Sequence, residues 1–418
     1  MNVLHVSNSI SGGAGQAAYR LHASLLKEGI GSKFLVLGNG NNDDIYHIPV
    51  LGHISKMEKL YKYINGYKKA KIYPYSKYKN IYQLFSDHYS LYSITKHEAF
   101  KNADIINLHW SMGFINYPEV INNRHGKKLV WTLHDMNPFT GGCHYDAGCG
   151  RFETGCQTCP QLTGINVEPD LASKIWIQKR KLYNSLDNER MSIICPSKWM
   201  SRMVAKSPLG QFKSRIIPNG IDCDLYKPFD KYIARERISV HKDTKIVLFV
   251  AGNTQNIRKG YGYLIEALRR IRHIKDLLLV TVGENTYAGR VDVPNIQLGL
   301  VNDESLMSLI YSAADVLVLP TEQDNLPNTL IEAMACALPV IGFDVGGVGE
   351  IIDHAVSGKL VKFGDIDCLA KEIDLMLADT ELALRMGKNG RMRATKLFSQ
   401  QKQAKDYLEH YYREIVRH

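Results

Sequence analysis

The stretch from Ala314 to Glu350 constrains the fold more than any other part of the chain. It reads ADVLVLP, then a turn rich in Asp, Asn and Pro, then the helix-forming run LIEAMACA, and then PVIGF before a Gly-Gly turn. A short buried strand, a polar loop, a helix and a second buried strand, in this order, are typical of a parallel α/β sheet. We therefore expect the α/β class, with ligand-binding loops at the carboxyl ends of the strands.

Two carboxylates lie where such a sheet binds its ligand. Asp324 follows the first strand, and Glu332 lies one turn inside the helix, which we expect Asn328 or Thr329 to cap. Backbone N–H groups at a helix start attract phosphate oxygens, and carboxylates accept hydrogen bonds from hydroxyl groups. The loop therefore suits a ligand that carries both phosphate and hydroxyls, such as a nucleotide-activated sugar.

The chain is too long for one ordinary domain. It has 418 residues, of which 45% are hydrophobic and 22% are charged, so we expect a globular protein with two domains of about 200 residues each. Without a signal-peptide pattern or an apolar run of about 20 residues, we expect a cytoplasmic protein. The net charge of +10 fits anionic substrates or a membrane surface, whereas nucleic acid is disfavoured because its binding motifs are absent from the sequence.

The first half alternates strand and helix in the same way. Val3–Ser7 reads as a strand and 16–27 as a helix, and Gly12 and Gly13 lie in the loop between them, where a backbone can approach a phosphate. The spacing is not G-x-G-x-x-G, so a tight turn without a ligand is the alternative.

Two later strands are each followed by a histidine, in His109-Trp110 and in His134-Asp135. Because the carboxyl ends of parallel strands meet at one edge of a sheet, we expect these residues to face the cleft that the glycine loop also faces. Purely structural histidines are the alternative.

Four cysteines follow at once. Cys143, Cys149, Cys156 and Cys159 have the spacing C-x5-C-x6-C-x2-C. The last pair resembles half of a zinc knuckle, and four thiolates would complete a closed, structural tetrahedral site. Free thiols and a disulfide-stapled loop stay open, although a reducing cytoplasm makes disulfides the less frequent use.

Residues 51–82 have a different composition, with eight lysines and seven tyrosines against one acidic residue. Lysine stems and tyrosine rings suit the boundary between water and lipid, so we expect contact with the inner face of the membrane or with an acceptor. A solvated insertion is the alternative. In the second half, Arg258 and Lys259 at a helix start suit a diphosphate, or are a solvated basic pair, and Gly283 ends the next strand.

These motifs together resemble a known family. The stretch TEQDNLPNTLIEAMACALPVIGFDVGGVGEII is similar to the E-x7-E region of the retaining glycosyltransferases of family 4, and so are IPNGIDCDLYKP, RKGYGYLIEAL and SGGAGQAAYRL. The segments WTLHDMNPFTGGCHY and CQTCPQL further resemble bacterial enzymes that build colanic acid, capsule and O-antigen chains. Where many relatives have the first Glu, this chain has Asp324, with the spacing to Glu332 kept.

The resemblance implies the GT-B fold, in which two doubly wound, Rossmann-like domains face a cleft. Residues 1–217 would form the acceptor domain, with a basic and aromatic insertion at 51–100 and the cysteine cluster at 143–159. Residues 218–398 would form the nucleotide-sugar donor domain. The helix at 399–418 would cross back to the N-terminal domain.

The resemblance also implies a role for each candidate residue. Glu332 would bind the ribose, Asp324 the donor sugar, and His134 would line the reaction centre, while Arg258 and Lys259 would neutralise the departing diphosphate. The implied catalytic residues are His134, Arg258, Lys259 and Asp324; the implied donor-binding residues are Gly12, Gly13, Arg258, Lys259, Gly283, Asp324, Asn325, Leu326, Pro327, Asn328, Thr329 and Glu332; the implied acceptor-binding residues are His109, Trp110, His134 and Asp135.

The expected function is retaining transfer of a sugar from a UDP- or GDP-linked donor to a glycan or lipid-linked glycan during synthesis of a bacterial surface polysaccharide. No cofactor is expected for catalysis, because two built-in cations can stand in for a metal. One alternative is a nucleotide-sugar epimerase of the same fold, which needs no acceptor. Another is a non-catalytic sugar- or lipid-binding subunit of a polysaccharide assembly, against which the complete set of charged residues argues.

Overall fold

The structure is a computed structural model, and it forms two compact units. Unit 1 comprises Met1–Ile217 with Ala404–His418, and unit 2 comprises Pro218–Gln403. The described residues are 1–40, 43–49, 79–80, 84–90, 92–124, 126–163, 171–271, 273–284 and 291–416. Most of the lysine- and tyrosine-rich segment at 51–82 lies outside the described residues.

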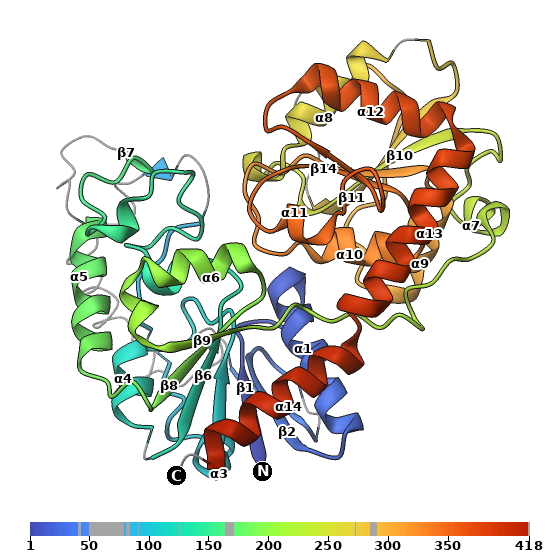
Figure 1. Cartoon of the computed structure of the whole chain (residues 1–418). Helices are drawn as coiled ribbons and strands as arrows, with labels where there is room; N and C mark the ends of the chain where they lie inside the picture. Colours follow the sequence, from blue (N-terminus) through green and yellow to red (C-terminus); the bar gives the residue numbers. More distant parts are fainter. Residues whose placement is uncertain are drawn as a thin grey trace. The chain divides into compact units, whose positions relative to one another are not determined.

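Unit 1 is built on a seven-stranded parallel sheet in the order β3-β2-β1-β5-β6-β8-β9 (Figure 1). The strands are β1 (Asn2–Val6), β2 (Gly31–Leu37), β3 (Ile45–Ile48), β5 (Ile105–Leu108), β6 (Lys128–Thr132), β8 (Met191–Cys195) and β9 (Lys213–Ile216). The helices are α1 (Gly12–Lys27), α3 (Glu98–Asn102), α4 (Tyr117–Asn122), η3 (Asn137–Phe139), η4 (Arg151–Glu153), α5 (Leu171–Asn184), α6 (Lys198–Ala205) and η5 (Pro208–Gln211). A short antiparallel pair joins β4 (Lys79–Asn80) to β7 (Leu162–Thr163).

Both faces of this sheet are covered. Successive strand residues point to opposite faces, so Val3 packs in one cluster with residues of α1 and α14 (Gln400–Val416), whereas Leu4 packs in another with residues of α3 and α4. Burial on both sides is the reason that these strands read as continuous apolar runs.

The last helix, α14, lies against unit 1, in red beside α1 in Figure 1. Asn107 Nδ2 donates to Tyr411 Oη at 2.7 Å, and Thr132 Oγ1 lies 2.9 Å from Tyr407 Oη. Both tyrosines are fully buried. The helix that was predicted to cross back to the N-terminal domain is therefore confirmed.

Unit 2 has a six-stranded parallel sheet in the order β12-β11-β10-β13-β14-β15. The strands are β10 (Lys245–Asn253), β11 (Leu277–Glu284), β12 (Asn295–Gln297), β13 (Val316–Leu319), β14 (Val340–Phe343) and β15 (Lys359–Val361). The helices are α7 (Lys231–Arg237), η6 (Ile257–Lys259), α8 (Tyr261–Arg270), α9 (Glu304–Ala313), α10 (Asn328–Ala335), α11 (Val348–Ile351), α12 (Ile366–Ala378) and α13 (Thr380–Leu397). The prediction of two doubly wound α/β domains is therefore confirmed.

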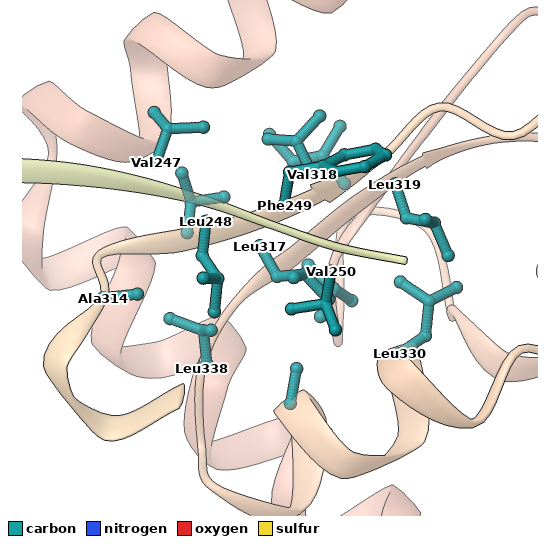
Figure 2. Close-up of a cluster of buried hydrophobic side chains, with 14 of the residues drawn as sticks. Val247, Leu248, Phe249, Val250, Ala314, Leu317, Val318, Leu319, Leu330 and Leu338 are labelled. Atoms are coloured by element: carbon teal, nitrogen blue, oxygen red, sulfur yellow. The ribbon is translucent and has the colours of Figure 1, made fainter. Parts of the chain in front are cut away.

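The centre of unit 2 is an apolar strand pair. Figure 2 shows side chains of β10 and β13, among them Phe249 and Leu317, packed with Leu330 of α10 and Leu338. Burial of one such side chain stabilises a fold by about 1.5–3 kcal/mol. The loops that follow β10 and β13 therefore start from a firmly packed base.

Among the described residues, no helix is both long and apolar enough to cross a membrane.

Two local predictions are wrong. The helix predicted at 16–27 begins at Gly12, so Gly12 and Gly13 form its first turn instead of a loop before it. The α10 helix begins at Asn328 after an extended Pro327, so neither Asn328 nor Thr329 caps it. The side chain of Asn328 instead accepts a hydrogen bond from Asn219 Nδ2 at 2.9 Å, which ties the helix start to the first residues of unit 2.

Candidate functional site

An ionic cluster lies at the carboxyl ends of β10 and β13. Lys259 Nζ is 2.6 Å from Asp324 Oδ2, and Arg258 Nη1 is 3.2 Å from the same oxygen. The two cations lie in η6, which follows β10, and the carboxylate lies in the loop that follows β13. Because β10 and β13 are neighbours in the sheet, the fold brings together three residues that the sequence predicts as catalytic.

Local geometry holds the two segments of the cluster together. The backbone oxygen of Arg258 accepts hydrogen bonds from Glu322 N and from Thr321 Oγ1, both at 2.8 Å. Gly260 follows with φ of +78°, and a Cβ there would lie 1.8 Å from the backbone oxygen of Pro320. Only glycine fits at this close approach, so the turn that presents Lys259 requires it.

The electrostatics of the cluster favour an anionic ligand. Burial would raise the pKa of Asp324, but the charges and hydrogen bonds of Lys259 and Arg258 outweigh this effect and lower that pKa to about 2. Burial lowers the pKa of Lys259, and Asp324 opposes that shift while Arg258 adds to it. Two cations share one carboxylate, so the cluster keeps a net positive charge for phosphate groups.

The backbone of Asp324 is supported by the Gly346–Gly347 turn. Gly347 N donates to Asp324 O at 3.0 Å, and a Cβ on Gly346, whose φ is +57°, would lie 1.9 Å from that oxygen. Asn325 N donates to Asp324 Oδ1 at 3.0 Å. Gly346 was not among the predicted site residues, although the Gly-Gly turn in the sequence was the signal that could have found it.

The remaining residues that were predicted to bind the sugar donor lie in this loop and at the start of helix α10. Asn325, Leu326 and Pro327 lead directly into it, and Asn328 and Thr329 form its first turn.

Glu332 lies one turn further along α10 and is only 5% exposed. Its Oε2 accepts a hydrogen bond from the buried Tyr311 Oη at 2.9 Å. Tyr311 was missed because it belongs to the apolar face of α9, and nothing in the sequence indicates that it meets Glu332.

Gly283 has a structural explanation. Its φ is +146°, and a Cβ there would lie 1.9 Å from the backbone oxygen of Ala251. The end of β11 must therefore pass very close to the end of β10. A Cβ on Gly12 or Gly13 would meet no atom within 4 Å, so close packing explains neither, although the φ of +72° at Gly12 favours glycine there.

In the described part of unit 1, His109, Trp110, His134 and Asp135 line one cavity at two adjacent strand ends, as predicted, whereas Gly12 and Gly13 are not among its lining residues. His109 Nδ1 lies 3.1 Å from His134 Nε2. Burial lowers the pKa of His134 to about 4, and burial together with neighbouring histidines holds that of His109 well below its usual value. Both rings are therefore neutral near pH 7.

Asp135 is surrounded by donors. Trp110 Nε1 donates to its Oδ2 at 2.7 Å, His144 Nδ1 lies 2.5 Å from that oxygen, and Asn137 N donates to its Oδ1 at 2.9 Å. Burial would raise the pKa of Asp135, but these contacts outweigh it and lower that pKa. Asp135 is thus suited to orienting Trp110 and His144, and His144 was missed because it lies inside the cysteine-rich stretch.

The four clustered cysteines, Cys143, Cys149, Cys156 and Cys159, line a second cavity of unit 1, and all four are free thiols. Burial raises the pKa of each of them. Within the described part of the chain, no group of three or more metal-ligating side chains is arranged to hold an ion. The zinc site therefore stays a prediction from the cysteine spacing.

Comparisons with known proteins cover nearly the whole chain. Residues 11–225 match the family model described as Glycosyltransferase Family 4, and residues 231–393 match that of Glycosyl transferases group 1. The chain is 25% identical over 382 residues to the "Putative colanic acid biosynthesis glycosyl transferase WcaC" of Escherichia coli K12, covering 86% of this chain and 87% of that protein.

Solved structures resemble the whole chain. The sucrose-phosphate synthase of Thermosynechococcus elongatus has a TM-score of 0.68 at 18% identity, covering all of both chains. Anabaena HepE, solved in complex with UDP-glucose, has a TM-score of 0.64 at 15% identity, covering 99% of each chain. At these identities the likeness shows the fold alone, and it confirms the predicted GT-B fold.

Proposed function

Because the chain belongs to glycosyltransferase family 4, we propose that it transfers a sugar from a nucleoside diphosphate to a glycan or lipid-linked glycan, with retention of anomeric configuration. We further propose that the product enters a bacterial surface polysaccharide, a role that its relationship to WcaC favours. The observation that carries the proposal is the buried cluster of Arg258, Lys259 and Asp324 beside the start of α10.

Each part of this cluster has a counterpart in such a donor. The diphosphate would meet the two cations and the first N–H groups of α10, where the helix dipole is positive. Glu332, held by Tyr311, would accept hydrogen bonds from the ribose hydroxyls. The solved complex of HepE with UDP-glucose, a protein of the same fold, favours a donor of this class.

The chemistry follows from charge. When the bond between the anomeric carbon and the phosphate oxygen breaks, negative charge grows on the departing diphosphate, and fixed cations stabilise it in the transition state. The acceptor hydroxyl attacks from the same face, forms the new glycosidic bond and passes its proton to the leaving phosphate oxygen. Asp324 is unsuited to act as a nucleophile, because Lys259, Arg258 and Asn325 N already engage its oxygens.

Trp110 and His134 would contact the acceptor, with Asp135 orienting the indole. A lipid-linked acceptor would also fit peripheral contact with the inner face of the membrane through residues 51–82. The composition of that segment supports this proposal. Sedimentation with anionic lipid vesicles, but not with neutral ones, is the expected result, and equal recovery in the supernatant with both would contradict it.

A thermal-shift screen of UDP- and GDP-linked sugars tests the donor, since a ligand that binds the folded state raises the melting temperature. Sugar transfer from the stabilising donor should depend on added acceptor, and NMR of the product should show the donor's anomeric configuration. Conversion of the donor sugar without acceptor would indicate an epimerase. A chain that no nucleotide sugar stabilises would contradict the proposal.

Transfer is expected to need no metal. Full activity in EDTA would agree with stabilisation of the departing diphosphate by the two protein cations. Recovery of activity only on adding a divalent cation would contradict it. Metal analysis of the purified chain tests the cysteine cluster separately. One zinc per chain, released without loss of transfer, would support a structural site.

A further inference from the structure

Three histidines form a hydrogen-bonded row across three neighbouring strands of unit 1. His5 Nδ1 lies 2.9 Å from His109 Nε2, and His109 Nδ1 lies 3.1 Å from His134 Nε2. His5 belongs to β1, and His109 and His134 follow β5 and β6, which lie side by side with β1 in the sheet. The row therefore runs from the sheet interior to the cavity that His134 lines.

The two ends of the row differ. His5 is fully buried. Its ring packs edge-on against His22 and is stacked on Phe34. Among the described residues, His5 Nε2 has no hydrogen-bond partner. His134 is partly exposed and stands beside the charged Asp135.

Proton counting leaves two arrangements. Burial, as the main cause, lowers the pKa of all three rings, so each is neutral near pH 7 and carries one proton. His109 can then donate to only one neighbour and must accept from the other. Either every ring donates from Nδ1 towards His134, or every ring donates from Nε2 towards His5.

The second arrangement would leave the Nε2–H of His5 as a buried donor without an acceptor. Buried N–H groups without an acceptor are rare and destabilising, whereas an unused acceptor is tolerated more often. The first arrangement leaves only an unused lone pair at His5 Nε2. The first arrangement is therefore the more stable of the two.

We infer that the row is polarised in one direction, so that His134 carries its proton on Nδ1 and acts as a hydrogen-bond donor, with His109 and His5 as positioning residues. The ligand group that His134 recognises is then an oxygen acceptor, such as a hydroxyl or ring oxygen of a sugar. In this arrangement the Nε2 lone pair of His134 accepts from His109, and its Nδ1 carries the proton. His134 therefore has no free lone pair with which to act as the base for an acceptor hydroxyl. This ligand role rests on the proposed function, whereas the tautomer does not.

NMR of protein labelled with 15N in its histidine rings tests the tautomer directly. The chain has 15 histidines, and the His5→Asn and His134→Asn variants assign the signals of interest. At pH 7 the two-bond correlations of His134 should show the Nδ1–H form. An Nε2–H form of His134, or an imidazolium anywhere in the row, observed in the wild-type protein at this pH, would overturn the inference.

A matched pair of variants tests the positioning role of His109. His109→Asn keeps an amide N–H near the position of Nδ1, so His134 should remain in the Nδ1–H form. His109→Phe keeps the ring but removes the donor, so part of the His134 population should shift to Nε2–H. The same tautomer in both variants would overturn the role of His109.

Activity gives an independent reading. His134→Asn places an amide near Nδ1 and His134→Gln places one near Nε2, so kcat/KM should be about twofold to tenfold higher in the Asn variant. The reverse order would overturn the donor role. Wild-type activity in both would remove His134 from the proposed function while the NMR result on the tautomer stands.

Discussion

The two units present opposite electrostatic surroundings at the carboxyl ends of their sheets. Unit 2 has a buried ionic cluster, in which Lys259 and Arg258 share the oxygen of Asp324. Unit 1 has a row of neutral imidazoles that ends at His134. Both sets lie in or directly after inner strands of a parallel sheet, so the fold alone does not decide whether the site is charged.

Under the proposed function, the two sets of residues would have different roles. A net positive cluster can balance a diphosphate, whose charge grows as it leaves. A neutral donor can recognise hydroxyl oxygens without competing for that phosphate. Substitutions in unit 2 should therefore act on turnover and nucleotide binding, and changes of pH should act first on unit 1.

Removal of the Lys259 ammonium should have the largest effect. Lys259→Ala should lower kcat by about 10²–10³-fold, the range for loss of one preorganised charge-stabilising group, while the fold is kept. Lys388→Ala, which removes an exposed lysine of the same unit, is the matched control. Near-wild-type turnover in Lys259→Ala, with a normal circular dichroism spectrum, would remove Lys259 from catalysis.

Acid should destabilise unit 1 before unit 2. The pKa of His134 and that of His22 are lowered from 6.5 to about 4, mainly by burial. The unfolded chain therefore binds more protons between these values, so stability is present above about pH 6.5 and is lost as the pH falls towards 4. The loss should be on the order of 3 kcal/mol for each histidine.

Tryptophan fluorescence measures this loss in unit 1, because Trp110, Trp131, Trp176 and Trp199 all lie there. Urea unfolding followed by fluorescence should give a lower free energy at pH 4.5 than at pH 7. Amide exchange in β10 reports on unit 2, where the lowered pKa of Asp324 keeps its contribution until the pH falls below about 3.8, towards 2. Equal losses in both units would contradict the comparison.

Loss of the Tyr311 hydroxyl should have a smaller effect, on binding alone. Tyr311→Phe removes one hydrogen bond to Glu332, so nucleotide affinity measured by calorimetry should fall about threefold to tenfold, with kcat at saturation unchanged. Tyr226→Phe is the matched control, because it removes the hydroxyl of a neighbouring buried tyrosine whose Oη lies 3.4 Å from Glu304 Oε1. Similar losses in the two variants would show that Tyr311 acts through packing.

Local patterns were sufficient to predict the inner strands of both sheets and to place Lys259 and Asp324 in loops after two strands of the same unit, whereas the edge strands β3, β12 and β15 were not predicted. Apolar runs mark buried strands, and the loops after neighbouring parallel strands converge at one edge whatever their details. The wrong start of α1 has a local cause as well. Gly15 precedes the predicted helix in the sequence, but it lies in the first turn of α1, where a Cβ would lie 2.5 Å from Ser9 O, so glycine lets this turn pack closely on the preceding backbone.

The contacts that orient the site could not be predicted. His5 lies inside an apolar strand and Tyr311 on an apolar helix face, and each meets its partner across more than 20 residues of chain, at His109 and at Glu332. Which side chains meet depends on register and packing between elements, and no short-range pattern encodes these. The sequence therefore indicated the groups that would contact a ligand better than the groups that hold them.

The smallest expected effect comes from lengthening Asp324. Asp324→Glu keeps the carboxylate charge beside Lys259 and Arg258, so affinity for the free nucleoside diphosphate should change by about twofold or less. The added methylene shifts the carboxylate relative to the sugar, so the ratio of kcat/KM between two nucleotide sugars should change by up to about tenfold. Asp324→Asn is the matched control, because it keeps the length but removes the charge that supports the Lys259 ammonium. It should therefore lower turnover without a comparable change in sugar preference. If Asp324→Glu leaves the preference unaltered, Asp324 serves only as the counter-ion of the two cations, and the sugar is recognised elsewhere.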